Sequence, residues 1–138
     1  MLLKFRLRSE NELHGRLKKK KFAEPAIRKA IDFLKEKRFI DDAVFASAWV
    51  DARLKKGMGP RRIARELAFK GIDKRLIEGE LARIKEDYPE DETALEIALR
   101  KKEKMKDIDP QKMRQRIYGY LIRRGFSPDT VIGVLNEL

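Results

Sequence analysis

One pattern of apolar residues occurs three times in this sequence, and that repetition limits the folds open to the chain. The six positions of the pattern are separated by steps of 4, 5, 5, 4 and 3 residues, with no gap in any copy. The three copies are Leu13, Leu17, Phe22, Ile27, Ile31 and Leu34; Ile63, Leu67, Ile72, Ile77, Leu81 and Ile84; and Ile117, Leu121, Phe126, Val131, Leu135 and Leu138. Each copy predicts two amphipathic helices joined by a short turn.

The turn inside each copy has a shared chemistry. A basic residue comes first (Lys20, Lys70 or Arg124), and Lys21, Gly71 or Gly125 follows it. Any two amphipathic helices joined by a short turn look somewhat alike, which is the alternative explanation of the pattern. Amphipathicity does not require a shared turn, however, so we interpret the pattern as internal repetition.

A further helix precedes the central copy and the last one. Asp41 is a suitable N-cap for a helix over residues 41–56, which is followed by Gly57 and by Pro60 at the start of the next helix. A second such helix is expected over residues 91–105, after a linker that contains Pro89. The sequence therefore predicts an all-α fold of three tandem three-helix repeats, bounded at 1–40, 41–88 and 89–138, in a curved and elongated body. The predicted core comprises the three copies of the pattern together with Phe45, Trp49, Phe69, Leu95 and Leu99.

The first repeat is incomplete in the sequence. Residues 1–8 alternate apolar and basic side chains, which alone indicates a short strand, whereas the repeat pattern favours the remnant of a first helix. Ser9 and Glu12 form the signature of a capping box, so a helix is expected from there to about Lys20. The next helix is expected to begin at Ala23 and to end near Lys37.

Composition narrows the class of protein. The chain has 138 residues, 41% of them charged, a formal net charge of +11 and no cysteine. The positive balance favours a polyanionic or acidic partner, and the lack of cysteine excludes disulfides and thiolate metal sites. No stretch approaches the roughly 20 apolar residues of a membrane span, and Met1–Phe5 is too short for a signal peptide. We expect a cytoplasmic monomer with no membrane partner.

The residues of catalytic chemistry are few. His14 is the only histidine, so neither a histidine-based triad nor a histidine pair for zinc can be built. The adjacent carboxylates of Asp41 and Asp42 are explained by helix capping in preference to metal binding. Gly57-Met58-Gly59 lacks the third glycine and the preceding strand of a dinucleotide site. The sequence predicts no enzyme, no metal site and no cofactor.

Basic residues recur at similar points of the repeats. If the repeats stack, these residues form a basic stripe that can meet phosphates or an acidic protein face; the alternative is a solvated surface. Arg61, Arg62 and Arg65 crowd the positive end of a helix, where cations are unfavourable, and this suggests an anion bound there. The candidate binding residues are Lys18, Lys19, Lys20, Lys21, Lys55, Lys56, Arg61, Arg62, Arg65, Lys70, Arg123 and Arg124.

Three segments of the sequence form a combined pattern. They are Asp41-Asp42-x-x-Phe45-Ala46-x-x-x-Val50-x-x-Arg53 with Gly57-x-Gly59, Ile63, Leu67 and Gly71-Ile72; Ser9-x-x-Glu12-Leu13-x-x-x-Leu17; and Leu121-x-x-Arg124-Gly125-Phe126-Ser127. Together these segments resemble the RecX family of regulators of the RecA recombinase. The resemblance covers nearly the whole chain. It implies a non-enzymatic, all-helical array of three-helix repeats that lies in the groove of the RecA–DNA filament. Such a protein limits filament extension, ATP hydrolysis and strand exchange in recombination, DNA repair and the SOS response.

Net charge and repeated basic turns also fit a different class, a general nucleic-acid-binding helical module with no recombinase partner. Single- or double-stranded DNA would then be the partner. The resemblance to a helix-turn-helix is weak, because the third helices are short and carry no clearly polar recognition face. The salt dependence of DNA binding without RecA separates the two functions.

Overall fold

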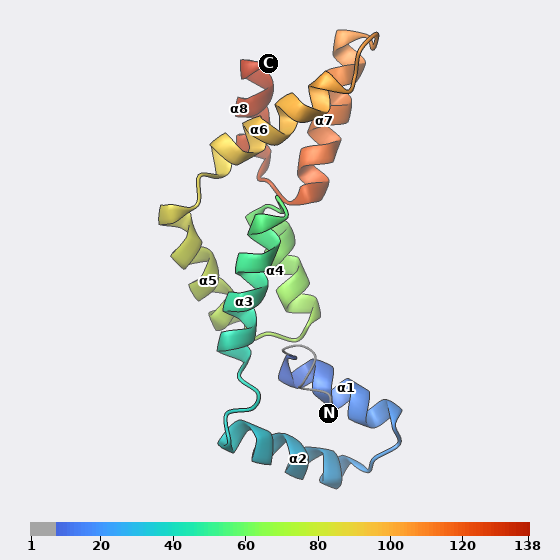
Figure 1. Cartoon of the computed structure of the whole chain (residues 1–138), viewed down its shortest axis with the longest axis vertical. Helices are drawn as coiled ribbons and strands as arrows, with labels where there is room; N and C mark the ends of the chain where they lie inside the picture. The colour runs from blue at the N-terminus through green and yellow to red at the C-terminus, as the bar shows by residue number, and fades with distance from the viewer. Residues whose placement is uncertain (1–7) are drawn as a thin grey trace. The chain divides into compact units, whose positions relative to one another are not determined.

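The computed structural model describes residues 8–138, which form eight α-helices and no strand (Figure 1). The all-helical prediction is confirmed. The helices are α1 (Glu10–Lys19), α2 (Glu24–Glu36), α3 (Asp42–Lys55), α4 (Pro60–Phe69), α5 (Lys74–Asp87), α6 (Glu90–Glu103), α7 (Pro110–Arg124) and α8 (Pro128–Glu137). No described helix is long and apolar enough to cross a membrane.

Side-chain caps fix where several helices begin. The Ser9 hydroxyl accepts from the Glu12 N–H while the Glu12 carboxylate accepts from the Ser9 N–H, so the predicted capping box is present. Asp41 and Asp73 accept from the first-turn N–H groups of α3 and α5. Asp109 and Ser127 do the same for α7 and α8. These caps supply partners to N–H groups that have none within the helix.

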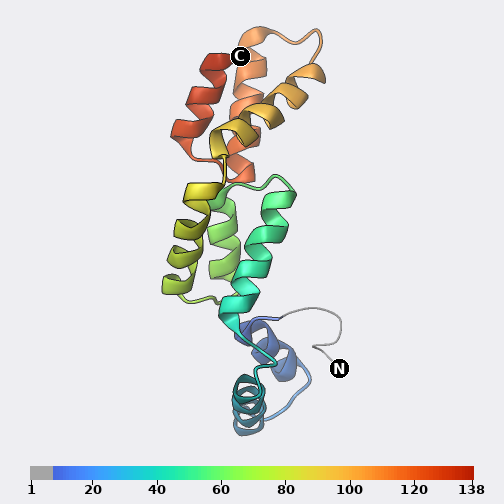
Figure 2. The same ribbon diagram turned by 60° about the vertical axis from the view of Figure 1, so that its left-hand side comes forward.

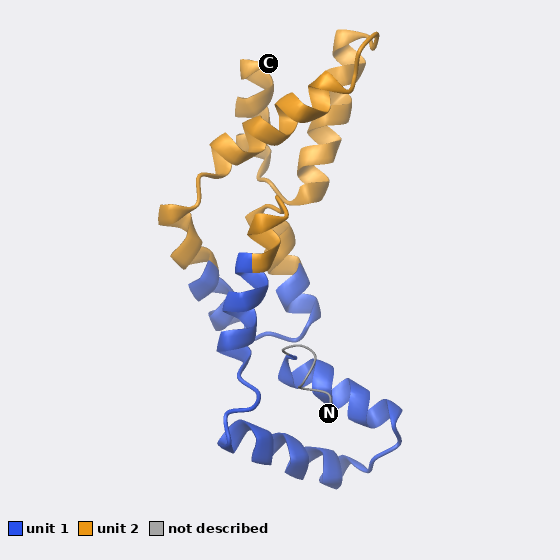
Figure 3. Cartoon of the chain, viewed as in Figure 1, with its two compact units in different colours: residues 1–51, 66–80 blue, residues 52–65, 81–138 orange. Residues whose placement is uncertain are grey.

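The chain divides into two compact units, which Figure 3 shows in two colours. The first contains residues 1–51 and 66–80, and the second contains residues 52–65 and 81–138. The repeat boundaries predicted at 1–40, 41–88 and 89–138 stay a prediction, because compactness groups the central helices differently.

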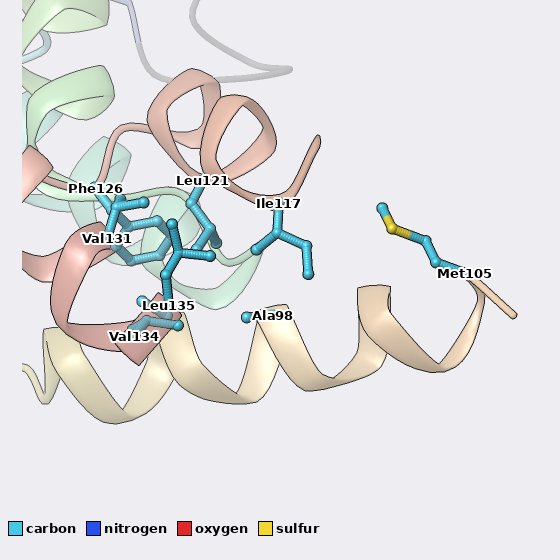
Figure 4. Close-up of a cluster of buried hydrophobic side chains, with 9 residues drawn as sticks. Ala98, Met105, Ile117, Leu121, Phe126, Val131, Val134 and Leu135 are labelled. Atoms are coloured by element: carbon cyan, nitrogen blue, oxygen red, sulfur yellow. The ribbon is translucent and has the colours of Figure 1, made fainter. Parts of the chain in front are cut away.

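Within the second unit, α6, α7 and α8 pack pairwise into a three-helix bundle, seen from two sides in Figures 1 and 2. Figure 4 shows its core, where Ile117 and Leu121 of α7 point toward α6, which carries Ala98, and Phe126 lies beside Val131 of α8. Small alanines at positions 94 and 98 let the backbone of α6 approach the larger side chains of α7 and α8. The buried members of this core are Ala94, Ala98, Met105, Ile117, Leu121, Phe126, Val131, Val134 and Leu135.

Within the first unit, α1 and α2 pack against each other and form a smaller core. Leu13, Ile27, Ile31 and Ile40 are buried there, and Leu17 and Leu34 are half-buried at its edge. With four buried side chains, this core is smaller than that of the α6–α8 bundle.

Three predicted core residues are exposed. Phe69 is 90% exposed because it follows Leu67 by two positions, roughly 200° around the helix from the buried face. Leu99 is exposed for a related reason, since the buried face of α6 runs through Ala98. Phe22 is 53% exposed although its counterparts Ile72 and Phe126 are buried. Phe126 packs with residues of α6, whereas no helix precedes α1 in residues 8–40.

Other predicted core positions are intermediate. Trp49, Leu81, Leu95 and Leu138 are half-buried, as are Leu17 and Leu34, and apart from the exposed Phe22 the remaining members of the three copies are buried. The linker predicted around Pro89 is shorter than expected, because α5 continues to Asp87 and α6 begins at Glu90. The question of strand or helix for residues 1–8 falls almost entirely on residues 1–7, outside the described part of the chain.

Candidate partner-binding surface

The basic turn of the central repeat, Lys70 and Gly71, makes contacts within the first unit. The carbonyl oxygen of Lys70 accepts a hydrogen bond from the Ser9 hydroxyl at 2.9 Å, and the Lys70 ammonium pairs with Glu12 at 3.1 Å. That ammonium also lies 4.3 Å from the centre of the Trp49 ring. A Cβ at Gly71 would lie 2.5 Å from the Cβ of Asn11. The turn between α4 and α5 of the central repeat thus packs against the start of α1. Because the first repeat is incomplete, α1 corresponds to the second helix of a complete repeat.

The second unit contains the equivalent contact. The N–H of Gly59 donates to the carbonyl of Arg124 at 2.6 Å, and the N–H of Arg61 donates to the carbonyl of Gly125 at 2.9 Å. The Arg124 guanidinium donates to the carbonyls of Lys56 at 2.5 Å and Gly57 at 3.1 Å. Gly59 stands 50 residues after Ser9, and Arg124 stands 54 after Lys70. These are the offsets between the repeats, so the contact of Gly59 with Arg124 is the equivalent of the contact of Ser9 with Lys70.

Lys70 and Arg124 therefore have a structural task in the folded chain. The side chain of Lys70 is only 17% exposed, and the Arg124 side chain is tied to backbone and to the Tyr120 hydroxyl at 3.1 Å. Of the predicted binding residues, these two have the least freedom to meet an external anion.

The three arginines at the start of α4 differ from one another. Arg62 is half-buried and donates to the carbonyl of Arg123 at 3.4 Å. Arg61 and Arg65 are exposed, and neither side chain forms an ion pair within the described residues. The carbonyl end of α7 meets the N–H end of α4, so part of the cost of crowding cations here is offset internally. Arg61 and Arg65, four residues apart on one helix, remain as the outward pair.

The other predicted residues lie on open surface. Lys18–Lys21 cover the last turn of α1 and the turn after it, and all four are exposed. Lys21 adopts a positive φ of 68°, the conformation that Gly71 and Gly125 adopt in the other two turns. Lys55, Lys56 and Arg123 are also exposed. Within the second unit the fold brings Lys56, Arg61, Arg62, Arg123 and Arg124 together, while Lys18–Lys21 form a separate patch in the first unit.

The residues with catalytic potential have structural roles. The His14 ring nitrogen Nε2 lies 2.8 Å from Glu24, and this hydrogen bond lowers the pKa of the Glu24 carboxyl. Asp41 caps α3, whereas Asp42 accepts from the N–H of Glu10 at 2.8 Å. Burial raises the pKa of the Asp42 carboxyl. Among residues 8–138, no group of three or more acidic, histidine or cysteine side chains is placed to hold a metal ion.

A basic groove in the second unit contains residues absent from the predicted binding set. It has a volume of about 430 Å³ and is lined by Lys101, Lys104, Met105, Ile108, Gln115, Arg116, Gly119 and Arg123. Arg116, Gly119 and Arg123 lie at helical spacing on α7, a signal visible in the sequence. What the sequence does not show is that the end of α6 lies against that face.

Comparison with known proteins agrees with this architecture. Three family models match in order: the first three-helix domain of RecX over residues 1–34, the second over 41–81 and the third over 89–135. A regulatory protein RecX of a Mycobacterium species is 34% identical over 138 residues, which cover 97% of this chain and 75% of the relative. This chain belongs to the RecX family.

Other RecX relatives are longer than this chain. The regulatory protein RecX of Bacillus licheniformis is 36% identical over 98% of this chain and 51% of the relative, and that of Clostridium botulinum is 35% identical over 95% and 62%. The chain thus spans between half and two thirds of those RecX proteins. Two RecX crystal structures share the fold. One has a TM-score of 0.85 at 22% identity, covering 99% of this chain and 67% of the other. RecX from Lactobacillus salivarius has 0.83 at 24%, covering 99% and 89%.

Proposed function

We propose that this protein is a non-enzymatic regulator that binds RecA nucleoprotein filaments and limits their ATP hydrolysis, extension and strand exchange. Membership of the RecX family across nearly the whole chain carries this proposal. Its place of action is the cytoplasm, where recombination and DNA repair take place.

The surface chemistry is compatible with such a partner. The predicted binding residues that stay exposed form two groups, Lys18–Lys21 in the first unit and the set around Arg61, Arg65 and Arg123 in the second. A filament of protein and DNA offers acidic side chains and phosphates, and arginine can grip either through two parallel hydrogen bonds. Because Lys70 and Arg124 are engaged within the chain, we assign the binding contacts to the other predicted residues.

The direct test adds the protein to RecA filaments preformed on single-stranded DNA. ATP hydrolysis and filament length are measured as the protein is titrated to stoichiometric excess. A fall in both quantities is expected. An unchanged rate of hydrolysis together with an unchanged length would refute the proposed function.

Direct DNA binding is measured in parallel without RecA. Binding driven by phosphate contacts weakens steeply as salt rises, with a slope of roughly −0.9 per duplex phosphate contact. Tight, salt-sensitive DNA binding with no effect on the filament would instead identify a general nucleic-acid-binding module.

A further inference from the structure

The groove between α6 and α7 is positive on both of its sides. Lys101 and Lys104 come from the end of α6, and Arg116 and Arg123 come from α7. No carboxylate is among the lining residues. Asp109, in the connecting segment, is occupied in capping the N–H of Lys112. The groove therefore concentrates positive charge that the lining itself does not neutralise, and its complement is a ligand with several negative charges.

The groove also has an apolar part. Met105 is 8% exposed and belongs to the core of the bundle, and Ile108 packs against the same core. Gly119 contributes no side chain to the lining, and the Arg123 guanidinium lies 3.1 Å from where its Cβ would stand. Cations around an aliphatic patch favour a ligand that carries an apolar group between its charges.

We propose that the α6–α7 groove binds an acidic peptide segment that carries an aliphatic side chain between its carboxylates. Arg116 and Arg123 bind carboxylates through their planar guanidinium groups, and Lys104 adds a flexible charge at the end of α6. The aliphatic side chain covers Met105 and Ile108.

Nucleic acid is the less suitable ligand for this groove. Single strands bind where bases stack on exposed aromatic rings within a cationic channel. The lining contains no aromatic residue. The ring of the nearby Tyr120 is already covered, with the Lys101 ammonium 4.4 Å from its centre and the Arg124 guanidinium 5.4 Å away.

We assign this peptide segment to the filament protein, and only that assignment rests on the proposed function. Peptide binding is measured on the full chain without RecA. A failure to bind the peptide therefore leaves the proposed function untouched, and a failure to regulate the filament leaves the peptide site untouched.

The experiment uses fluorescence anisotropy with three labelled probes of equal charge. The first is a peptide of glutamates around a central leucine, the second has serine in place of that leucine, and the third is a single-stranded oligonucleotide. The leucine peptide is expected to bind about tenfold more tightly than the serine peptide, the ratio that burial of one aliphatic side chain supplies.

Three variants separate the groove from general charge. Lys104→Glu with Arg116→Glu should weaken the leucine peptide by about tenfold or more, since both charges contact the ligand. Lys106→Glu with Lys112→Glu makes the same change in net charge on exposed residues outside the lining, and it should leave most of the affinity. Ile108→Ser removes an aliphatic side chain from the lining with no change in charge, and it should remove the preference for leucine over serine.

Two results would overturn the inference. One is that the two charge-reversal pairs weaken binding of the leucine peptide equally, which would show that binding depends only on net charge. The other is a preference for the oligonucleotide that Lys104→Glu with Arg116→Glu abolishes, which makes the groove a nucleic-acid site. Circular dichroism on each variant confirms that the helices are intact.

Discussion

The guanidinium of Arg124 donates a hydrogen bond to the carbonyl oxygen of Gly57 at 3.1 Å, and so joins the end of α7 to the turn before α4. The same guanidinium reaches the carbonyl of Lys56 and the hydroxyl of Tyr120. A residue that looks like a surface cation in the sequence is a structural link between two repeats. Lys70 has the equivalent role in the first unit, where it pairs with Glu12 and covers the Trp49 ring.

Arg124→Ala should lower the stability of the fold. It removes three donated hydrogen bonds, and the loss of charged hydrogen bonds from a half-buried site suggests a destabilisation of about 2 kcal/mol. Arg123→Ala is the matched control, since its side chain is exposed and the expected change is within about 0.5 kcal/mol. Urea unfolding of both variants measures the difference. Equal midpoints for the two would show that the Arg124 contacts contribute nothing net.

Gly125→Ala should be destabilising, whereas Gly133→Ala should not. Gly125 has a φ of 103°, and a Cβ there would lie 2.5 Å from the backbone nitrogen of Arg62. The left-handed conformation alone suggests a cost of about 1–2 kcal/mol for alanine, to which the clash adds. Gly133 lies inside α8 with no atom near an added Cβ, so alanine should stabilise by up to about 1 kcal/mol. Thermal melting checks this reversal of sign, and a loss of stability in both variants would contradict it.

Leu67→Asp should unfold the chain, and Phe69→Asp should not. Leu67 is fully buried, so an aspartate there is a charge without a partner. Phe69 is 90% exposed two residues later on the same helix. Circular dichroism spectra and melting curves are compared for the two variants. A normal helical spectrum and melting temperature for Leu67→Asp would contradict the repeat assignment.

The repeat pattern predicts most of the fold because helix periodicity is local. Steps of three, four and five residues place Ile63 and Leu67, or Ile117 and Leu121, on one buried face without knowledge of any partner. Caps are local as well, so Ser9 with Glu12 and Asp41 could be identified from the sequence. The prediction is wrong at Phe22, where burial depends on a helix from elsewhere, and at Phe69 and Leu99, which lie off the buried face of their own helices.

The candidate site is less predictable, because the sequence shows which residues are charged but not which groups they contact in the fold. Lys20, Lys70 and Arg124 occupy equivalent positions in the sequence, yet Lys20 is exposed while Lys70 and Arg124 are bound within the fold. Their difference arises from hydrogen-bond partners 58 to 68 positions away, which no local pattern reveals. The groove that Arg116 and Lys104 share has the same origin.

The carboxyl of Asp42 should make stability depend on pH. Burial is the largest cause of its raised pKa, which the hydrogen bond from the Glu10 N–H only partly opposes. The folded state therefore holds this proton to a higher pH than the unfolded state does. The resulting stabilisation is complete below the ordinary aspartate pKa of 3.8 and is lost as pH rises through the higher folded value.

Asp42→Asn removes this titration and provides the comparison. The free energy of unfolding of the wild type minus that of the variant should fall as pH rises upward from 3.8. Urea unfolding at a series of pH values gives this difference directly. A difference that stays flat or rises with pH would show that the pKa of Asp42 is not raised in the folded chain.

The outward arginines of α4 give the sharpest test of the binding face. Changing Arg61, Arg62 and Arg65 together to glutamate is not a clean experiment, because Arg62 donates to the carbonyl of Arg123 and a carboxylate there would face carbonyl oxygens. Arg61→Glu with Arg65→Glu leaves that contact in place. Both residues are exposed, and Arg61 lies in the first turn of α4, where an acidic side chain is favourable, so the melting temperature should stay equal or rise slightly.

The same double variant should lose inhibition of RecA ATP hydrolysis, since it reverses two charges that we assign to contact with the filament. We expect potency to fall by about tenfold or more, the usual scale for removing charged contacts at an interface. Lys106→Glu with Lys112→Glu carries the same net charge and should keep most of its potency. Melting and ATPase inhibition are measured on the same preparations. Wild-type potency in Arg61→Glu with Arg65→Glu would make this patch ordinary solvated surface, and Lys18–Lys21 would then be the next face to reverse, because they are the other group of predicted residues that stays exposed.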